Sequence, residues 1–387
     1  MRDKKENETM KRRLLILSVI FLLLASASAC TVKPDTDGSK NKKETGDIIP
    51  EGGKYIVNKS MKMLAEGENM PEVAAPGDRF YIDEYVYTMA EDGWKVKLKT
   101  SVARTEASYS DLMDEIGGMP VTDLTDLFKG CTSLTASPKL PNNTKILKNT
   151  FDGCTSLKEA PELPATVMDM EHTFNACKSL VKAPAIPSAV TSLGYTFNDC
   201  TALVEASAIP AGVTNMEYTY NNCANLKKAP TLPEGLTTMN YTFSGCSSLT
   251  EAPALPSTVK KMSYTFDRCT GLTKAPALPA TVTMVNYVFC GCTGITEAPE
   301  IPETVSEMTG LFKDCVNLKT VGKIPANVKY MLDTFNGCTS LTGTIVIDAT
   351  PMDIASCFRS VNFAAQNLTL TGASGNLEKL LKTGIYE

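Results

Sequence analysis

The sequence predicts a β-rich repeat solenoid of about ten 23-residue coils, with an α+β cap at its N-terminal end and a second cap at its C-terminal end. Phenylalanine recurs every 23 residues from 128 to 335, with Tyr220 in one of its places, and a cysteine follows each of these aromatics by three residues. No insertion or deletion interrupts the series. A fixed period of about 20–50 residues is typical of stacked repeats, because one unit cannot bury its apolar face alone.

Residues 1–30 have the composition of an export signal. A basic stretch, Lys11–Arg13, precedes the apolar run Leu14–Leu24, which is too short to span a bilayer as a helix. The segment ends in Ala-Ser-Ala-Cys30, which resembles the cleavage site of bacterial lipoproteins, in which this cysteine is lipidated. A plain secretory signal cut near Ala29 stays open, as does a start at Met10 rather than Met1. Either signal exports the protein. The polar residues 31–54 predict a flexible tether.

Residues 55–120 predict the N-terminal cap, made of a hairpin and a helix. Arg79–Tyr87 and Trp94–Thr100 have strand composition, and Glu91–Gly93 between them is a turn signal. Tyr109–Ile116 follows a capping pattern and predicts a short helix. The first coil of a solenoid exposes its core unless a polar-faced segment covers it, so a cap is expected here. An independent binding module is the alternative.

Residues 121–342 are the predicted array, and each coil repeats the same apolar positions. We expect the phenylalanines to form the core. Gly, Asn or Asp precedes the cysteine in eight of ten coils, and these residues best tolerate the left-handed backbone of a tight corner. Ala176 and Arg268 are the exceptions, so the corner is not expected to require that conformation strictly. One coil carries the apolar positions at Leu249, Ala252, Leu255, Val259, Met262, Phe266 and Cys269.

Proline divides each coil into two kinds of segment. Most coils contain Ala-Pro-x-Leu-Pro, as at 252–256. Proline cannot donate to a ladder, so we expect this segment to be extended or polyproline-like, with a short strand at most. Val259–Thr265 lacks proline and is rich in strand formers. It is therefore the better candidate for a continuous ladder between coils.

Ten of the thirteen cysteines fall at the same point of successive coils. Side chains of one column point the same way, whereas a disulfide needs converging Cβ vectors. We interpret the column as buried free thiols that act as small apolar side chains, with some bridging in an oxidising compartment as the alternative. Cys290 and Cys357 lie off this column and are assigned no role.

Residues 343–387 predict the second cap. Thr344–Ile347 and Asn367–Thr371 have strand composition, and Asn376–Lys382 has that of a helix.

The repeat resembles a known bacterial family. Val213-Thr-Asn-Met-Glu-Tyr-Thr-Tyr-Asn-Asn-Cys-Ala-Asn-Leu226 is similar to the core of BspA-like surface leucine-rich repeats in its Val, Met, aromatic, Cys and Leu spacing. The resemblance covers residues 120–342 and departs at Ala-Pro-x-Leu-Pro, where the family has a strand. It implies a leucine-rich-repeat-like array on a cell surface, in proteins linked to adhesion and host binding. The resemblance implies no catalytic residues.

Two columns of side chains are candidates for function. The first alternates in charge, which predicts exposed, in-register neighbours of opposite sign, and a polar ligand track is its functional alternative. The second is aromatic and ends before either end of the array. It is interpreted either as a structural ladder or as a contact stripe for a protein or glycan. The charge column is Glu159, Lys182, Glu205, Lys228, Glu251, Lys274 and Glu297, and the aromatic column is His172, Tyr195, Tyr218, Tyr241, Tyr264 and Tyr287.

These features predict a non-enzymatic binding or adhesion protein that presents an extended repeat surface to an extracellular protein or glycan. A structural envelope spacer is the alternative. We expect no enzyme, because the carboxylates fall in repeating columns rather than at one cleft, and no cofactor or metal, because the chain has a single histidine. Its net charge of −5 does not fit nucleic acid. We expect export and attachment to the bacterial cell envelope through a lipid on Cys30 only.

Overall fold

The computed structural model describes residues 55–57, 76–77, 79–82, 84–100, 102, 104–116 and 118–372. The predicted signal at 1–30, the tether at 31–54 and the helix at 376–382 lie outside these residues. Within them, no helix combines the length and apolar character that crossing a membrane needs. The chain forms two compact units. Ala103–Asp114 belongs to the second unit with the array, whereas Glu115–Val121 belongs to the first.

The first unit is built on six strands: β1 Tyr55–Val57, β2 Arg79–Ile82, β3 Tyr85–Met89, β4 Trp94–Leu98, β5 Glu115–Ile116 and β6 Met119–Asp123. They form one sheet in the order β1-β2-β3-β4-β6-β5. The predicted turn at 91–93 is confirmed, because β3 and β4 pair antiparallel with Tyr87 opposite Val96 and Met89 opposite Trp94. The single strand expected at 79–87 is wrong, because the chain reverses within it and β2 pairs antiparallel with β3. Alternate side chains of both strands are buried, and the Trp94 indole Nε1 donates to the carbonyl oxygen of Ile116 at 3.0 Å.

Residues 109–116 differ from the predicted helix. Residues 109–114 contain no helical turn, and Glu115–Ile116 is strand β5. Contacts with the first coil replace the local capping pattern: the Asp111 carboxylate accepts from the Lys139 amide at 3.1 Å. Tyr109 packs on Phe128, with ring centroids 5.3 Å apart. This segment therefore covers the first phenylalanine of the array, which is the role expected of a cap.

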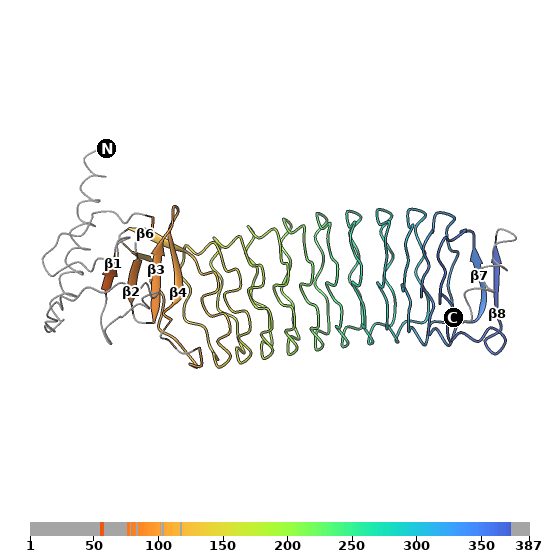
Figure 1. The fold of residues 1–387 in the computed structure, drawn as a ribbon, viewed down its shortest axis with the longest axis horizontal. Helices are drawn as coiled ribbons and strands as arrows, with labels where there is room; N and C mark the ends of the chain where they lie inside the picture. The colour runs from red at the N-terminus through yellow and green to blue at the C-terminus, as the bar shows by residue number, and fades with distance from the viewer. Residues whose placement is uncertain are drawn as a thin grey trace, which may run out of the picture. The chain divides into compact units, whose positions relative to one another are not determined.

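The second unit is the predicted repeat solenoid. Its coils lie side by side along one axis, and the chain advances by one coil per repeat (Figure 1). Phe243, Phe266 and Phe289 are fully buried, and neighbouring ring centroids are 5.7 and 5.8 Å apart with nearly parallel planes. The phenylalanine column is therefore a continuous core, and the in-register stacking on which the fold prediction depends is confirmed.

The array continues beyond residue 342. Phe358 lies one period after Phe335 and stacks on it at 5.3 Å, so a further coil occupies part of the segment predicted as the C-terminal cap. Strand β7 (Gly343–Ile347) pairs parallel with β8 (Leu368–Gly372), with Ile345 opposite Leu370. These strands are the blue arrows of Figure 1. β7 occupies the position in its coil that Ala-Pro-x-Leu-Pro occupies in the other coils. Because β7 contains no proline, its backbone amides can form a ladder here.

The coils with both prolines form their ladder elsewhere, as predicted. Residues between the two prolines make no backbone hydrogen bond to a neighbouring coil in the described part of the array. The segment before the phenylalanine carries the ladder instead: the amides of Met239, Tyr241 and Phe243 donate to carbonyl oxygens of the next coil at 2.8–2.9 Å. It is a series of tight turns rather than a regular strand. The buried Thr242 hydroxyl adds a further bond, to the Met216 carbonyl at 2.8 Å.

Candidate functional site

The aromatic column is built on an unusual backbone. Every residue two positions before the phenylalanine of a coil, or before Tyr220, has φ between 52° and 62°, in the left-handed region. L-residues other than Gly, Asn and Asp rarely adopt this region, because Cβ approaches the carbonyl oxygen. The column carries Asp126 and Asn149 at one end and Gly310 and Asp333 at the other. Between them the same conformation is held by one histidine and five tyrosines, His172, Tyr195, Tyr218, Tyr241, Tyr264 and Tyr287.

The corner before the cysteine has the same backbone requirement. Ala176 and Arg268, which suggested a tolerant corner, both have a φ of 55°. The expectation that this position does not need the left-handed conformation is therefore wrong. Each coil contains two left-handed residues four positions apart, because the chain must turn twice around the phenylalanine that it buries.

The aromatic rings stack continuously through six coils. Centroid distances are 4.4 Å for His172–Tyr195, Tyr195–Tyr218 and Tyr218–Tyr241, and interplanar angles there are 9–10°. The stack continues at 4.5 and 4.7 Å to Tyr287. All six side chains are half-buried. Since each inner ring has a neighbour on both faces, the accessible part of the stack is a row of ring edges and hydroxyl groups.

Ring stacking alone does not account for tyrosine at these positions. The left-handed conformation costs about 1–2 kcal/mol for a residue with a bulky side chain. Ring stacking contributes roughly 0.5–1.5 kcal/mol per pair beyond burial. Apart from the partial burial of the rings, the two effects nearly cancel, whereas Gly avoids the backbone cost and Asn lowers it. Residues held in such regions tend to cluster at functional sites, so the tyrosines are the best candidates for a contact surface.

Gly310 ends the stack on its C-terminal side. A Cβ at this position would lie 2.2 Å from the Tyr287 ring, and the residue has a φ of 58°. The backbone of the next coil therefore takes the place of a seventh ring. At the other end, Asn149 donates its side-chain amide to the Asp126 carboxylate at 3.0 Å. The row of aromatic edges is thus bounded on both sides by local features of the sequence.

A column of amides runs three residues after the aromatics. Asn221 donates to Asn198 at 2.7 Å, Asn198 to Asn175 at 2.7 Å, and Asn175 to Asp152 at 2.6 Å. The 23-residue spacing of Asn175, Asn198 and Asn221 is the sequence signal for this ladder. Its hydrogen bonds join side chains of successive coils beside the tyrosines.

Burial favours the uncharged form of five side chains of the aromatic column. Burial, together with the neighbouring tyrosine, raises the pKa of Tyr195, Tyr218, Tyr241 and Tyr264 above the ordinary value of 10.0. Burial lowers the pKa of His172 below 6.5. The hydroxyl groups of these four tyrosines therefore stay protonated at neutral pH, so each can both donate and accept a hydrogen bond.

The charge column lies on another segment of the coil, directly before Ala-Pro-x-Leu-Pro. All seven side chains are exposed. Parallel bridges place Glu159, Lys182, Glu205 and Lys228 beside one another in chain order. The Lys182 ammonium lies 3.4 Å from the Glu205 carboxylate. The structure thus places opposite charges next to one another on a solvent-facing row.

The cysteine column is buried, as predicted. The Cys269 thiol donates to the Phe243 carbonyl at 3.1 Å, and the equivalent bond recurs from coil to coil. Cys290 lies in the amide column, where burial and Asp267 raise its pKa to about 12. Cys357 is buried in the threonine column of the last coil, and burial raises its pKa to about 12. Such thiols are poor nucleophiles.

Comparison with known proteins agrees with this geometry. Residues 125–250 and 215–342 match the family described as "BspA type Leucine rich repeat region", with six copies. No curated protein sequence matches the chain. A leucine-rich repeat protein from Bacteroides ovatus is similar in fold, with 20% identity and a TM-score of 0.61 over 76% of each chain.

Two further solved structures are less similar. The leucine-rich repeat protein of T. pallidum is 28% identical over 49% of this chain and 88% of its own, with a TM-score of 0.43. A leucine-rich cell surface protein from Faecalibacterium prausnitzii is 15% identical over 80% and 98%, with a TM-score of 0.41. The family match extends from residue 125 to residue 342, more than half of the 387 residues. This chain belongs to the BspA-type leucine-rich repeat proteins.

Proposed function

We propose that this protein is a non-enzymatic binding protein displayed on the bacterial cell surface, and that its aromatic column contacts a protein partner. The observation that carries the proposal is the run of tyrosines held in the left-handed region, where Gly would avoid the backbone cost and Asn would lower it. Rigid aromatic side chains concentrate binding energy at interfaces. Repeat arrays provide extended surfaces for such contacts.

The stacked geometry favours a protein over a glycan as the partner. Inner rings of the column have both faces covered by neighbours 4.4–4.7 Å away. An aromatic ring that packs on a sugar must offer an open face, and these do not. Ring edges and hydroxyl groups suit the mixed apolar and hydrogen-bonding contacts of a protein surface.

The N-terminal sequence is the basis for proposing that the protein is displayed on the cell surface. The apolar run Leu14–Leu24 and the Ala-Ser-Ala-Cys30 motif support export and lipidation at Cys30. The polar residues 31–54 would act as the tether. The F. prausnitzii protein is described as a cell surface protein, which supports the same location for this chain. A spacer without a ligand is the second candidate, supported by the regularity of the array.

Replacing Tyr218, Tyr241 and Tyr264 by Asn tests the stripe. Asn tolerates the left-handed conformation, so the free energy of unfolding is expected to change little, by about 1 kcal/mol per site or less. Intact cells displaying the full chain are applied to arrays of purified extracellular matrix proteins and of glycans. We expect binding to a protein, and a loss of about tenfold or more in the variant.

The matched control exchanges residues of the same column outside the stripe, Asp126→Asn and Asp333→Asn, and should keep binding. Cys30→Ala should release the chain into the medium. Retained binding in the tyrosine variant, or a large loss of stability without loss of binding, would show that the column is only structural. Binding to glycans alone would contradict a protein partner.

A further inference from the structure

The five tyrosines of the aromatic column form one continuous stack of phenol rings. From Tyr195 to Tyr287, neighbouring ring centroids lie 4.4–4.7 Å apart, and neighbouring planes differ by 6–10°. All five residues share one backbone conformation, with φ between 54° and 57°, and all are half-buried. Each phenol therefore has nearly the same surroundings as the phenol of the next coil, and its ring is in direct contact with it.

The hydroxyl groups of neighbouring tyrosines also influence one another. Burial raises the pKa of Tyr195, Tyr218 and Tyr241, and in each case the hydroxyl group of the next tyrosine in the stack adds to the shift. A phenol hydroxyl can donate to one neighbour and accept from the other. The hydroxyl groups therefore follow one another in series from Tyr195 to Tyr264, alongside the stacked rings.

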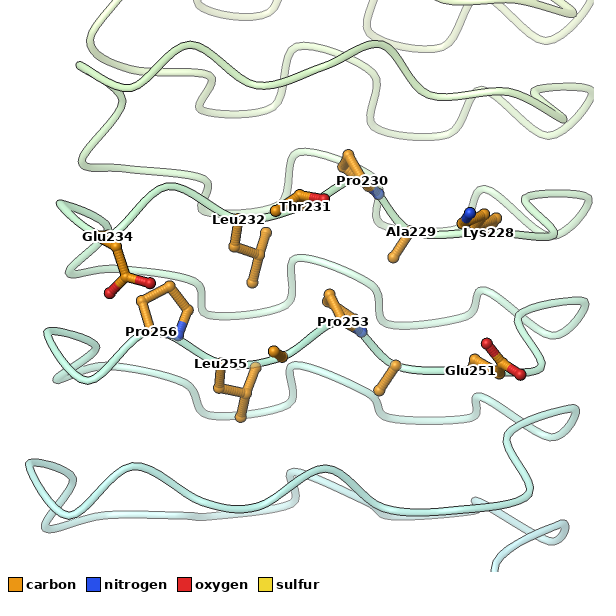
Figure 2. A pocket seen from close by; sticks show the side chains of 12 residues that line it. Lys228, Ala229, Pro230, Thr231, Leu232, Glu234, Glu251, Pro253, Leu255 and Pro256 are labelled. Atoms are coloured by element: carbon orange, nitrogen blue, oxygen red, sulfur yellow. The ribbon is translucent and has the colours of Figure 1, made fainter.

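The aromatic column is the part of the array best suited to one-electron oxidation. A phenol gives up its hydroxyl proton together with the electron, so it needs a proton acceptor. The half-buried hydroxyl groups of the column reach water, whereas Tyr220 is fully buried and its hydroxyl group has no hydrogen-bond partner. The groove between 228–234 and 251–256, shown in Figure 2, is lined by aliphatic, proline, threonine and charged side chains and contains no phenol.

We propose that the aromatic column is a radical relay: it is oxidised by a diffusible one-electron oxidant, such as a peroxyl or nitrogen dioxide radical, and passes the oxidation from coil to coil. The oxidant takes one electron from a tyrosine and becomes an anion, and that tyrosine releases its hydroxyl proton to water. The tyrosyl radical then takes a hydrogen atom from the neighbouring tyrosine. One O–H bond forms on the first residue and one breaks on the second, so each step moves the radical by one coil.

The repeat makes transfer along the relay nearly neutral in free energy. Donor and acceptor are the same residue type in the same backbone conformation, so neither side of a step is strongly favoured. The relay ends where the phenols end, at His172 on one side and at Gly310, which has no side chain, on the other. It also gives a reason for tyrosine in this column, because phenylalanine would keep the ring contacts but has no hydrogen atom to pass on.

A tethered photo-oxidant tests the relay in the full chain. Glu171, one coil before Tyr195, is replaced by Cys and labelled with a ruthenium(II) polypyridyl complex, in a background with Cys30→Ser and Cys290→Ser. Light and pentaamminechlorocobalt(III) convert the label to ruthenium(III), which oxidises the nearest tyrosine by one electron. The trap 2-methyl-2-nitrosopropane marks tyrosyl radicals, and peptide mass spectrometry locates the adducts. We expect adducts along the whole stack, as far as Tyr287.

Tyr241→Phe interrupts the relay at its centre. The variant keeps a ring in the stack and removes only the hydroxyl group, so the fold should be retained, which circular dichroism checks. With the label at position 171, adducts should persist at Tyr195 and Tyr218 and be lost at Tyr264 and Tyr287. The loss is expected because the hydrogen atom that each step transfers is missing at position 241.

Two controls complete the test. Moving the label to Thr309→Cys, at the other end of the stack, should reverse the pattern of kept and lost adducts. Tyr330→Phe removes an exposed tyrosine outside the column and should change neither pattern. Adducts confined to the tyrosine nearest the label in the unaltered column, or adducts that persist beyond position 241 in the Tyr241→Phe variant, would overturn the relay. No binding partner is present, so the result is independent of the proposed protein contact.

Discussion

Raising the pH from about 8 to about 10 is expected to unfold the array. Burial raises the pKa of nine thiols of the cysteine column, and of the Cys357 thiol in the last coil, above the ordinary value of 9.0. Below that value both states hold the thiol protons, and above it the unfolded chain releases them while the folded chain cannot. Stability is therefore complete below about pH 9 and falls as pH rises. The thiols concerned are Cys154, Cys177, Cys200, Cys223, Cys246, Cys269, Cys292, Cys315, Cys338 and Cys357.

The number of these thiols makes the effect large. Each contributes about 1.4 kcal/mol per pH unit above its unfolded pKa. Ten of them together amount to on the order of 10 kcal/mol by about pH 10. That equals the whole free energy of unfolding of a typical domain, about 5–15 kcal/mol.

Urea unfolding at a series of pH values measures the effect. The comparison is a variant with five column cysteines replaced by Ser, at 177, 200, 223, 246 and 269. Serine keeps a donor for the carbonyl of the preceding coil but does not titrate in this range. The dependence of stability on pH above about pH 9 should fall by roughly half. Tyrosines titrate in both proteins, so an unchanged slope would mean that the thiols are not the cause.

Phe266→Ala is expected to cost about 3–5 kcal/mol of unfolding free energy. The Phe266 ring is fully buried between Phe243 at 5.7 Å and Phe289 at 5.8 Å. Its removal leaves a cavity that two coils share, and their closely bonded backbones limit collapse into it. Each coil of a repeat array is stabilised by its interfaces with the neighbouring coils. Weakening two of these interfaces should therefore also make the unfolding transition less cooperative.

Denaturant titration followed by circular dichroism measures this prediction. Phe266→Leu is the matched control, since it keeps most of the apolar volume and should lose less. A cost below about 1 kcal/mol for the alanine variant would show that the phenylalanines do not carry the core.

The regular spacing was enough to predict the columns. One period of 23 places Phe266 over Phe243, buries the cysteines and aligns the charges, and proline within Ala-Pro-x-Leu-Pro explains where the ladder is missing. The helix predicted at Tyr109–Ile116 does not form, because Asp111 accepts a hydrogen bond from the first coil and Tyr109 packs on Phe128 of that coil. Such long-range contacts are not visible in a local pattern.

The left-handed backbone conformation of the tyrosines could not be predicted from the sequence either. Tyrosine has no preference for positive φ, so Tyr218 and Tyr241 gave no local signal. The indirect signal was the presence of Asn149, Gly310 and Asp333 in the same column. The further coil at Phe358 was missed because Cys357 precedes that ring, whereas the cysteine of other coils follows it.

The most direct test of in-register stacking is a series of spin-label distances along the charge column. Nitroxides are attached to cysteines introduced at Glu159 and, in turn, at Lys228, Glu251 and Glu297, in a background with Cys30→Ser and Cys290→Ser. Double electron–electron resonance should give distances that rise linearly by about 4.8 Å per coil, to about 14, 19 and 29 Å. Distances that fail to increase with the number of coils would contradict the stacked array and every column derived from it.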